Sequence, residues 1–109
     1  MNKNIDDIEF TIFDTETTGL EPESGDRIVE LAAIRCKGKE NIATFQTLIN
    51  PQRPISSAAA AVNRITPDML KDAPSIDEVM PSFLSFIQDS CLCSYNAAFD
   101  LGFLNNELR

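Results

Sequence analysis

Histidine is absent from the 109 residues of this sequence, and so is tryptophan. Histidine is the side chain best suited to act as a general acid or base near neutral pH, and it is also a frequent metal ligand. Any chemistry carried by this chain must therefore use other groups. Carboxylates are the most plentiful of these, with 17 aspartates and glutamates.

Long apolar runs are lacking as well. No stretch is apolar for long enough to cross a bilayer, and the first ten residues, MNKNIDDIEF, are too polar for a signal peptide. The three cysteines, Cys36, Cys91 and Cys93, are odd in number and lie in apolar stretches. We expect buried free thiols in a reducing, cytoplasmic setting, with no membrane association and no zinc site.

Basic side chains are few. Nine lysines and arginines against 17 acids give a formal net charge of −8. Non-specific binding to nucleic acid normally uses a broad Lys/Arg surface, which this composition cannot supply. Contact with nucleic acid would therefore have to be local and assisted by a metal ion.

The first half of the chain is predicted to form three strands. Apolar and polar residues alternate with a period of two, and the stretches are separated by turn-forming residues. Gly38 lies between the second and third strands and indicates a hairpin turn. The strands are predicted at residues 8–14, 27–37 and 41–50.

The second half is predicted to be mainly helical. Short helical turns are expected at residues 56–63 and 66–71, the latter with Thr66 as N-cap and Pro67 in its first turn. A longer helix is expected after Ser75, with an apolar face at Ile76, Val79, Met80, Phe83, Leu84 and Ile87.

Two features mark the ends of these later elements. Ser75 and Glu78 have the spacing of a capping box, and Pro81 is expected to bend the helix or fray its start. A short strand is predicted at residues 91–95, and Asn96 is expected to cap a helix that runs to the C-terminus.

This order of elements predicts an α/β fold. Three consecutive strands favour an antiparallel arrangement, and the strand–helix–strand connection favours a parallel fourth strand, which we expect near the sheet centre. The predicted architecture is a mixed sheet with flanking helices in a single domain of residues 1–109.

Asp14 and Glu16 are the first candidates for chemistry. Residues two apart in a strand share a face, with Cα atoms about 7 Å apart. Two oxygen donors at the carboxyl end of a strand suit a hard cation, Mg²⁺ or Mn²⁺. The alternative is that both carboxylates cap a turn in solvent.

Asp100 favours the metal hypothesis. It lies within an apolar stripe of the last helix, formed by Ala97, Leu101, Leu104 and Leu108. A carboxylate on a core-facing stripe is costly without a partner, and a metal shared with Asp14 and Glu16 would provide one. The alternative is an interaction of Asp100 with the helix dipole.

The sequence resembles a known family at this point. FDTETTGL at residues 13–20, followed by RIVELAAI, resembles the first motif of the DEDD-type 3′–5′ exonucleases, the superfamily of proofreading exonucleases and ribonuclease T. SYNAAFDLGFLNNEL at residues 94–108 resembles the second motif, and INPQRPISSAAAAVNRITPDML resembles the segment that connects the two.

The resemblance implies a ribonuclease H-like fold and a two-metal site that hydrolyses phosphodiester bonds at the 3′ end of DNA or RNA. Its implied partners are a single-stranded or frayed 3′ end and a polymerase or helicase polypeptide. The implied metal-binding and catalytic acids are Asp14, Glu16 and Asp100, and the implied substrate-binding residues are Thr17, Gly19, Leu20 and Asn96.

The sequence also departs from the family pattern. Tyr95 precedes Asn96 where a histidine is common, and Asn63-Arg64 replaces a common His-Gly pair. The third motif, which carries a fourth metal-binding acid and a general base, does not follow the second within the 109 residues. We therefore expect the N-terminal two-thirds of such a domain, with a weakly held second metal and feeble or absent activity.

Other hypotheses remain open from the sequence. The chain could be a non-catalytic remnant or a nucleic-acid-binding module. Asp14, Glu16 and Thr18 also loosely match the strand end of haloacid dehalogenase-type phosphatases, in which the first aspartate is a nucleophile. Glu30, which interrupts the apolar run IVELAAI, could support the acidic site or simply form a hydrogen bond or face solvent.

Overall fold

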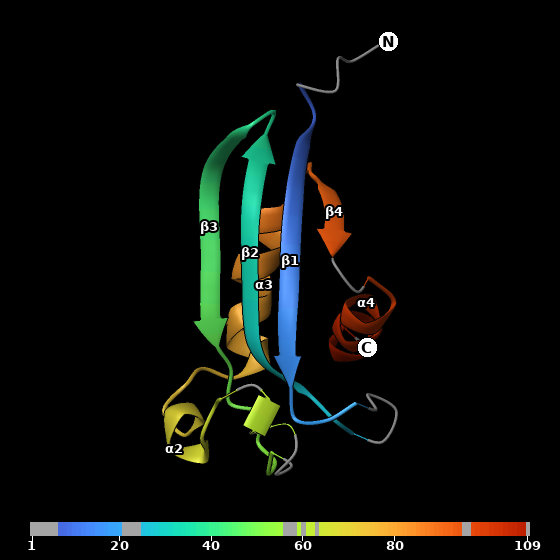
Figure 1. The fold of residues 1–109 in the computed structure, drawn as a ribbon. Helices are drawn as coiled ribbons and strands as arrows, with labels where there is room; N and C mark the ends of the chain where they lie inside the picture. Colours follow the sequence, from blue (N-terminus) through green and yellow to red (C-terminus); the bar gives the residue numbers. More distant parts are fainter. Residues whose placement is uncertain are drawn as a thin grey trace.

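The computed structural model describes residues 7–20, 25–55, 59, 61–62, 64–94 and 97–108, and every structural statement below concerns these residues. Four strands form one sheet in the order β3-β2-β1-β4 (Figure 1). Their bounds are Glu9–Thr17 for β1, Ile28–Lys37 for β2, Glu40–Leu48 for β3 and Cys91–Ser94 for β4.

The mixed character of the predicted sheet is confirmed. β1, β2 and β3 pair antiparallel, and β4 pairs parallel with β1. The predicted place of β4 near the sheet centre was wrong, because β4 lies at an edge and β1 and β2 are central. The first three strands remain neighbours in chain order, which leaves β3 and β1 as the free edges, and the crossover through α3 places β4 beside β1.

The hairpin between β2 and β3 is confirmed at Gly38. Lys37 pairs with Glu40, so Gly38 and Lys39 form a two-residue connection. Gly38 has a φ of 60°, which a residue without a Cβ adopts at little steric cost.

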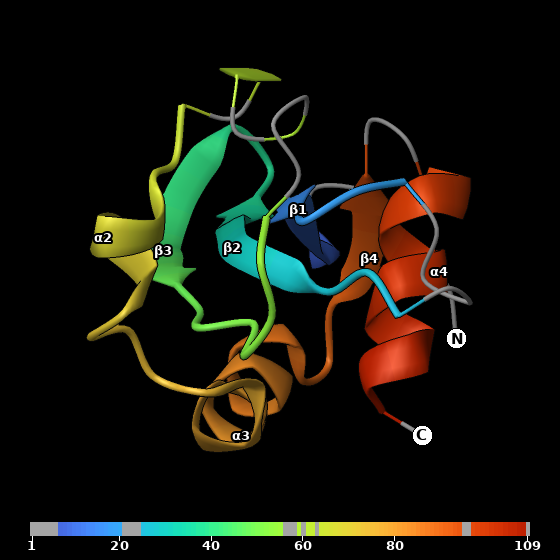
Figure 2. The ribbon, with the colours of Figure 1, turned by 90° about the horizontal axis from the view of Figure 1, so that it is seen from below.

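The helices that can be bounded within the described ranges are α2 at Pro67–Leu70, α3 at Ile76–Ile87 and α4 at Ala97–Glu107. α3 covers one face of the sheet, and α4 lies beside β4 (Figures 1 and 2). Phe83 of α3 is fully buried, with its ring centroid 6.1 Å from that of Phe13 and 5.7 Å from that of Phe45. These rings form the centre of the core.

The core has two parts. The main cluster joins the sheet to α3 and α4. A smaller one comprises Val29, Ile65 and Leu70, with Leu48 and Ile55 packed against it. It attaches α2 and the segment before it to the carboxyl-terminal part of β3 and the start of β2 (Figure 1).

The two predicted helix starts differ in detail. Thr66 caps α2 as predicted, accepting a 3.4 Å hydrogen bond from the backbone nitrogen of Met69. Ser75 occupies the N-cap position of α3, but its hydroxyl donates to the carboxylate of Glu78 at 3.3 Å instead of accepting from the backbone. The capping-box prediction was therefore wrong in its contacts, and α3 continues through Pro81 to Ile87.

Two further predictions concern surface properties. None of the helices in the described ranges could span a membrane by length and apolarity. The expectation of buried thiols was wrong, because Cys91 is exposed and Cys36 and Cys93 are only half-buried. Cys91 and Cys93 belong to the edge strand β4, where an apolar sequence does not ensure burial.

Most of the helical turn expected at residues 56–63 lies outside the described residues.

Candidate active site

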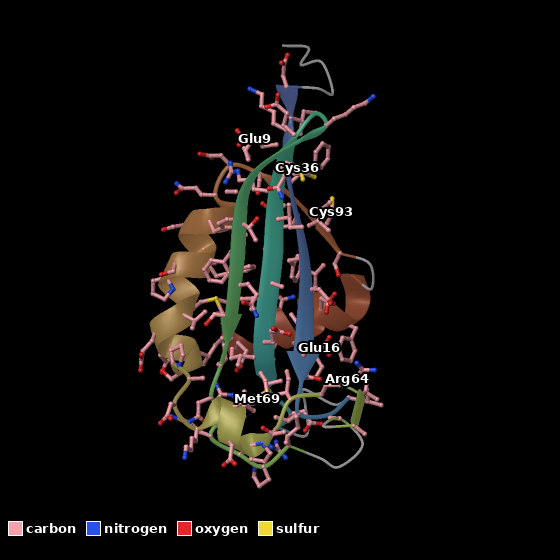
Figure 3. The ribbon with its side chains drawn as sticks, turned by 60° about the vertical axis from the view of Figure 1, so that its left-hand side comes forward. Glu9, Glu16, Cys36, Arg64, Met69 and Cys93 are labelled. Carbon is pink, nitrogen blue, oxygen red and sulfur yellow. The ribbon has the colours of Figure 1, made fainter. Side chains whose placement is uncertain are left out.

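Strand β1 separates its side chains onto two faces, as its alternation predicts. Thr11, Phe13, Thr15 and Thr17 are buried. Asp14 is exposed and Glu16 half-buried on the opposite face, with Glu16 near the carboxyl end of the strand (Figure 3). The two carboxylates thus share a face, as predicted.

These two carboxylates carry unfavourable negative charge. Partial burial, followed by the charges of Asp100 and Glu30, raises the pKa of Asp14 despite a hydrogen bond from the Thr15 backbone. Burial and the charges of Asp14, Glu30 and Asp100 raise the pKa of Glu16. Within the part of the chain that the structure describes, neither carboxylate forms an ion pair. A cation would relieve this repulsion.

Glu30 adds to the same acidic face. It pairs directly with Glu16 across β1 and β2, and its Oε2 accepts a 2.5 Å hydrogen bond from Nε2 of Gln46 on β3. The carboxylate is therefore hydrogen-bonded, as one alternative held, but it also contributes to the charge around Asp14 and Glu16.

Asp100 is buried, with a relative exposure of 2%. Thr15 Oγ1 donates to its Oδ1 at 2.6 Å, and the Ser94 hydroxyl donates to its Oδ2. The side chain therefore points inward from α4, as predicted, and both carboxylate oxygens have protein partners.

The predicted apolar stripe around Asp100 had the wrong phase. Leu101 and Leu108 are 37% and 48% exposed, while Phe103 and Leu104 are buried. The buried side of α4 runs through Asp100, Phe103, Leu104 and Glu107. Leu104 is common to the predicted and observed stripes.

The structure brings the acids close without gathering three of them around one point. Asp14, Glu16 and Glu30 share one side of the sheet, whereas the carboxylate of Asp100 contacts Thr15 on the other side of β1. Among the described residues, no three acids or cysteines are arranged to hold one metal ion. The oxygen-only donor set fits a hard divalent cation, and each Asp100 oxygen retains a lone pair.

The segment after β1 is held by side-chain hydroxyls. Thr17 Oγ1 donates to the carbonyl of Gly19 at 2.5 Å, and Thr18 Oγ1 donates to Oδ1 of Asp26 at 2.8 Å. A Cβ at Gly19 would lie 2.4 Å from Oδ2 of Asp26, so a side chain there would displace that carboxylate. These contacts fix the path of the chain beside the acids.

The other residues implied by the family differ in exposure. Thr17 is buried, and Leu20 is 77% exposed. Asn96 and Tyr95 lie outside the described residues.

Sequence reasoning missed the residues that hold Asp100. Thr15 alternates with the two acids in the string DTET, and its phase along β1 could have placed its hydroxyl on the buried face. Ser94 carries no comparable signal. It approaches Asp100 through the pairing of β4 with β1, which places Ser94 beside Phe13.

The chain is similar to known exonucleases and replication polymerases. The family described as "RNase_T: Exonuclease" matches residues 11–109. The chain is 44% identical over 101 residues to the PolC-type DNA polymerase III of Caldanaerobacter subterraneus subsp. tengcongensis, covering 93% of this chain and 7% of that polymerase. It is 46% identical over 101 residues to the DNA polymerase III subunit epsilon of Treponema pallidum, covering 93% of this chain and 46% of that subunit.

A solved structure supports the same assignment. Exonuclease X, determined in complex with 5′ overhanging duplex DNA, superposes with a TM-score of 0.70 at 35% identity, covering 84% of this chain and 51% of that one. The match to the family extends over nearly the whole chain, and the strand carrying Asp14 and Glu16 lies inside it. This chain therefore belongs to the RNase T exonuclease family.

Proposed function

We propose that the chain carries a divalent-metal-dependent 3′–5′ exonuclease site, with Asp14, Glu16 and Asp100 as the metal-binding acids. The observation that supports it best is the pair of carboxylates on β1 whose pKa values are raised by burial and by neighbouring negative charge, with no ion-pair partner among the described residues. Such a pair is unfavourable by itself and favourable around a cation.

The three acids have different parts in this proposal. Asp14 and Glu16 would hold Mg²⁺ or Mn²⁺ on the accessible side of β1, and Asp100 would contribute from α4 with its orientation set by Thr15 and Ser94. A bound divalent cation supplies positive charge that offsets the phosphate and promotes attack by water.

The segment after β1 is proposed to bind the 3′ end of the substrate. The exposed side chain of Leu20 can contact the terminal base or sugar, while Thr17 and Gly19 fix the backbone beneath it. Asn96 is proposed as a further substrate contact. The substrate is a single-stranded or frayed 3′ end, which a local site can bind despite the acidic surface.

The relatives suggest the setting. Similarity to PolC-type polymerase and to subunit epsilon supports a cytoplasmic role in replication or repair, next to or within a polymerase polypeptide. The nucleic acid bound to exonuclease X supports DNA as the substrate.

The test is a degradation assay on a 5′-labelled single-stranded oligonucleotide with Mn²⁺. We expect a ladder that shortens stepwise from the 3′ end, lost in Asp14→Ala and retained in Asp72→Asn, an exposed acid in the connection between α2 and α3. We expect slow turnover, because a general base contributes about 10²–10⁴-fold and the chain has no histidine.

Other outcomes identify the competing functions. A trapped aspartyl-phosphate at Asp14 would indicate a phosphatase. Binding of the oligonucleotide without any shortening, even at high enzyme concentration, would indicate a binding module and refute the nuclease proposal.

A further inference from the structure

A second carboxylate, Glu107, lies on the buried side of α4. Its side chain is only 5% exposed, and its Oε1 accepts hydrogen bonds from Nε and Nη2 of Arg27 at 3.1 and 2.9 Å. Its Oε2 is buried and has no hydrogen-bond partner among the described residues. Both bonds from the guanidinium thus converge on one oxygen.

Glu107 and Asp100 are two turns apart on the same helix. Seven residues rotate the helix by nearly two full turns and advance it by about 10 Å, so the two side chains point to the same side. Between them Phe103 and Leu104 enter the core. α4 is therefore attached by an apolar centre and by one polar contact toward each end.

Each polar contact leads to a different part of the sheet. Asp100 is bonded to Thr15 of β1 and Ser94 of β4. Glu107 is bonded to Arg27, which directly precedes β2, and the segment leading into β2 passes beside α4 (Figures 1 and 2). The apolar contacts alone could accommodate a small slide or rotation of α4, whereas the two polar contacts oppose both.

Arg27 also organises the segment after β1. Its backbone nitrogen donates to Oγ1 of Thr18 at 3.0 Å, and its carbonyl accepts from the Thr18 nitrogen at 2.8 Å. Arg27 thus connects two parts of the site: its backbone anchors the segment that carries Gly19 and Leu20, and its side chain anchors the helix that carries Asp100.

We propose that Arg27 and Glu107 are positioning residues of the acidic site, whose ion pair fixes α4 and thereby the position of Asp100 relative to Asp14 and Glu16. The inference rests on the proposed metal-dependent function. An ion pair with a buried member contributes little net stability compared with apolar side chains, but it restricts geometry, because displacing the half-buried Arg27 leaves the buried charge of Glu107 unpaired. Residues that orient metal ligands through others affect metal affinity by about 10–100-fold.

The test compares Mn²⁺ affinity of the 109-residue chain and its variants, measured by electron paramagnetic resonance of free Mn²⁺. Arg27→Met is expected to raise the dissociation constant about tenfold or more, and Arg27→Lys, which keeps the charge but loses the two-bond geometry, is expected to lie between Arg27→Met and the wild type. Glu107→Gln, which keeps the shape, is a second variant that removes the charge.

The matched control is Arg35→Met. Arg35 forms an ion pair of the same 2.9 Å length with Glu9 and donates to the carbonyl of Phe86 at 2.7 Å, toward the other end of β1. Its loss should lower the melting temperature without changing Mn²⁺ affinity by more than about twofold. A loss of affinity caused only by reduced stability would appear in both variants.

The outcomes separate the two proposals. Asp14→Ala tests the metal site itself, so wild-type affinity in that variant refutes the proposed function. If Asp14→Ala abolishes binding while Arg27→Met and Glu107→Gln bind Mn²⁺ as the wild type does, the positioning role is wrong and the metal site stands. Equal losses in Arg27→Met and Arg35→Met would also overturn the inference.

Discussion

Replacing Asp14 by asparagine should stabilise the metal-free chain while destroying its response to metal. The substitution keeps the size of the side chain and removes one of two like charges on the same face of β1. Burial and those neighbouring charges already raise the pKa of both Asp14 and Glu16, so in the absence of a cation the ionised pair works against folding.

The magnitude follows from the strand spacing. Side chains two residues apart are separated by about 7 Å, and two unit charges at that distance repel by about 0.6 kcal/mol at the dielectric constant of water. Asp14 is exposed, so the dielectric constant of water applies, and with the added repulsion from Asp100 and Glu30 a gain of about 0.5–1 kcal/mol is expected. For a domain of this size that corresponds to a rise in melting temperature of about 2–6 °C.

Metal should reverse the order of the melting temperatures of the wild type and Asp14→Asn. Mn²⁺ at ten times its dissociation constant would stabilise the wild type by about 1.4 kcal/mol and leave Asp14→Asn unchanged. Thermal melts in chelator and in millimolar Mn²⁺ test this, with Asp72→Asn as a control for net charge. The reasoning fails if Asp14→Asn melts below the wild type in chelator, or if Mn²⁺ raises both melting temperatures equally.

Three further perturbations test individual contacts. First, the metal-free chain should gain stability as the pH falls from neutral, because the folded-state pKa values of Asp14 and Glu16 lie above the ordinary 3.8 and 4.5, so the folded state binds protons more tightly. This gain in stability should be complete at pH values below these ordinary pKa values. Urea unfolding of the wild type and of an Asp14→Asn/Glu16→Gln double variant across this pH range measures it. Parallel pH profiles of stability for the two proteins would contradict the prediction. Second, Gly19→Ala should lower the free energy of unfolding by about 1–3 kcal/mol, because the added Cβ clashes with Asp26. Gly102→Ala should instead raise it by about 0.5–1 kcal/mol, because Gly102 lies in α4 and nothing is within 4 Å of its Cβ. Equal effects of the two substitutions in urea unfolding would refute the packing argument. Third, Thr15→Val should cost about 1–3 kcal/mol by leaving Oδ1 of the buried Asp100 without its donor, and an unchanged urea midpoint would refute this.

The sheet could be predicted from local patterns, but the place of its last strand could not. Alternation along β1 and β2 and the glycine turn determine which residues pair and which face is buried. β4 has only four residues, and nothing within them specifies a neighbour. Its position depends on how α3 packs across the sheet, which is a tertiary effect, and its exposed Cys91 follows from that edge position.

The phase of α4 shows why part of the site was missed. Two stripes of helical spacing are possible, one through Leu101 and Leu108 and one through Phe103 and Glu107, and both contain Leu104. Counting apolar residues favours the first, because the second carries acids at both ends. The second is buried because hydroxyls from β1 and β4 and the guanidinium of Arg27 are bonded to those acids.

The failure of the apolar pattern on α4 is informative about function. A helix selected only for stability would place leucines where Asp100 and Glu107 lie, since apolar side chains in such positions are as stable as paired charges or more so. Here each buried acid instead has partners supplied by other elements of the fold: Thr15 of β1 and Ser94 of β4 for Asp100, and Arg27 for Glu107. Such partners add little stability but fix where the helix stands relative to β1. Because the proposed chemistry depends on the distance between Asp100 and the acids of β1, we interpret the weak amphipathicity of α4 as a consequence of that requirement.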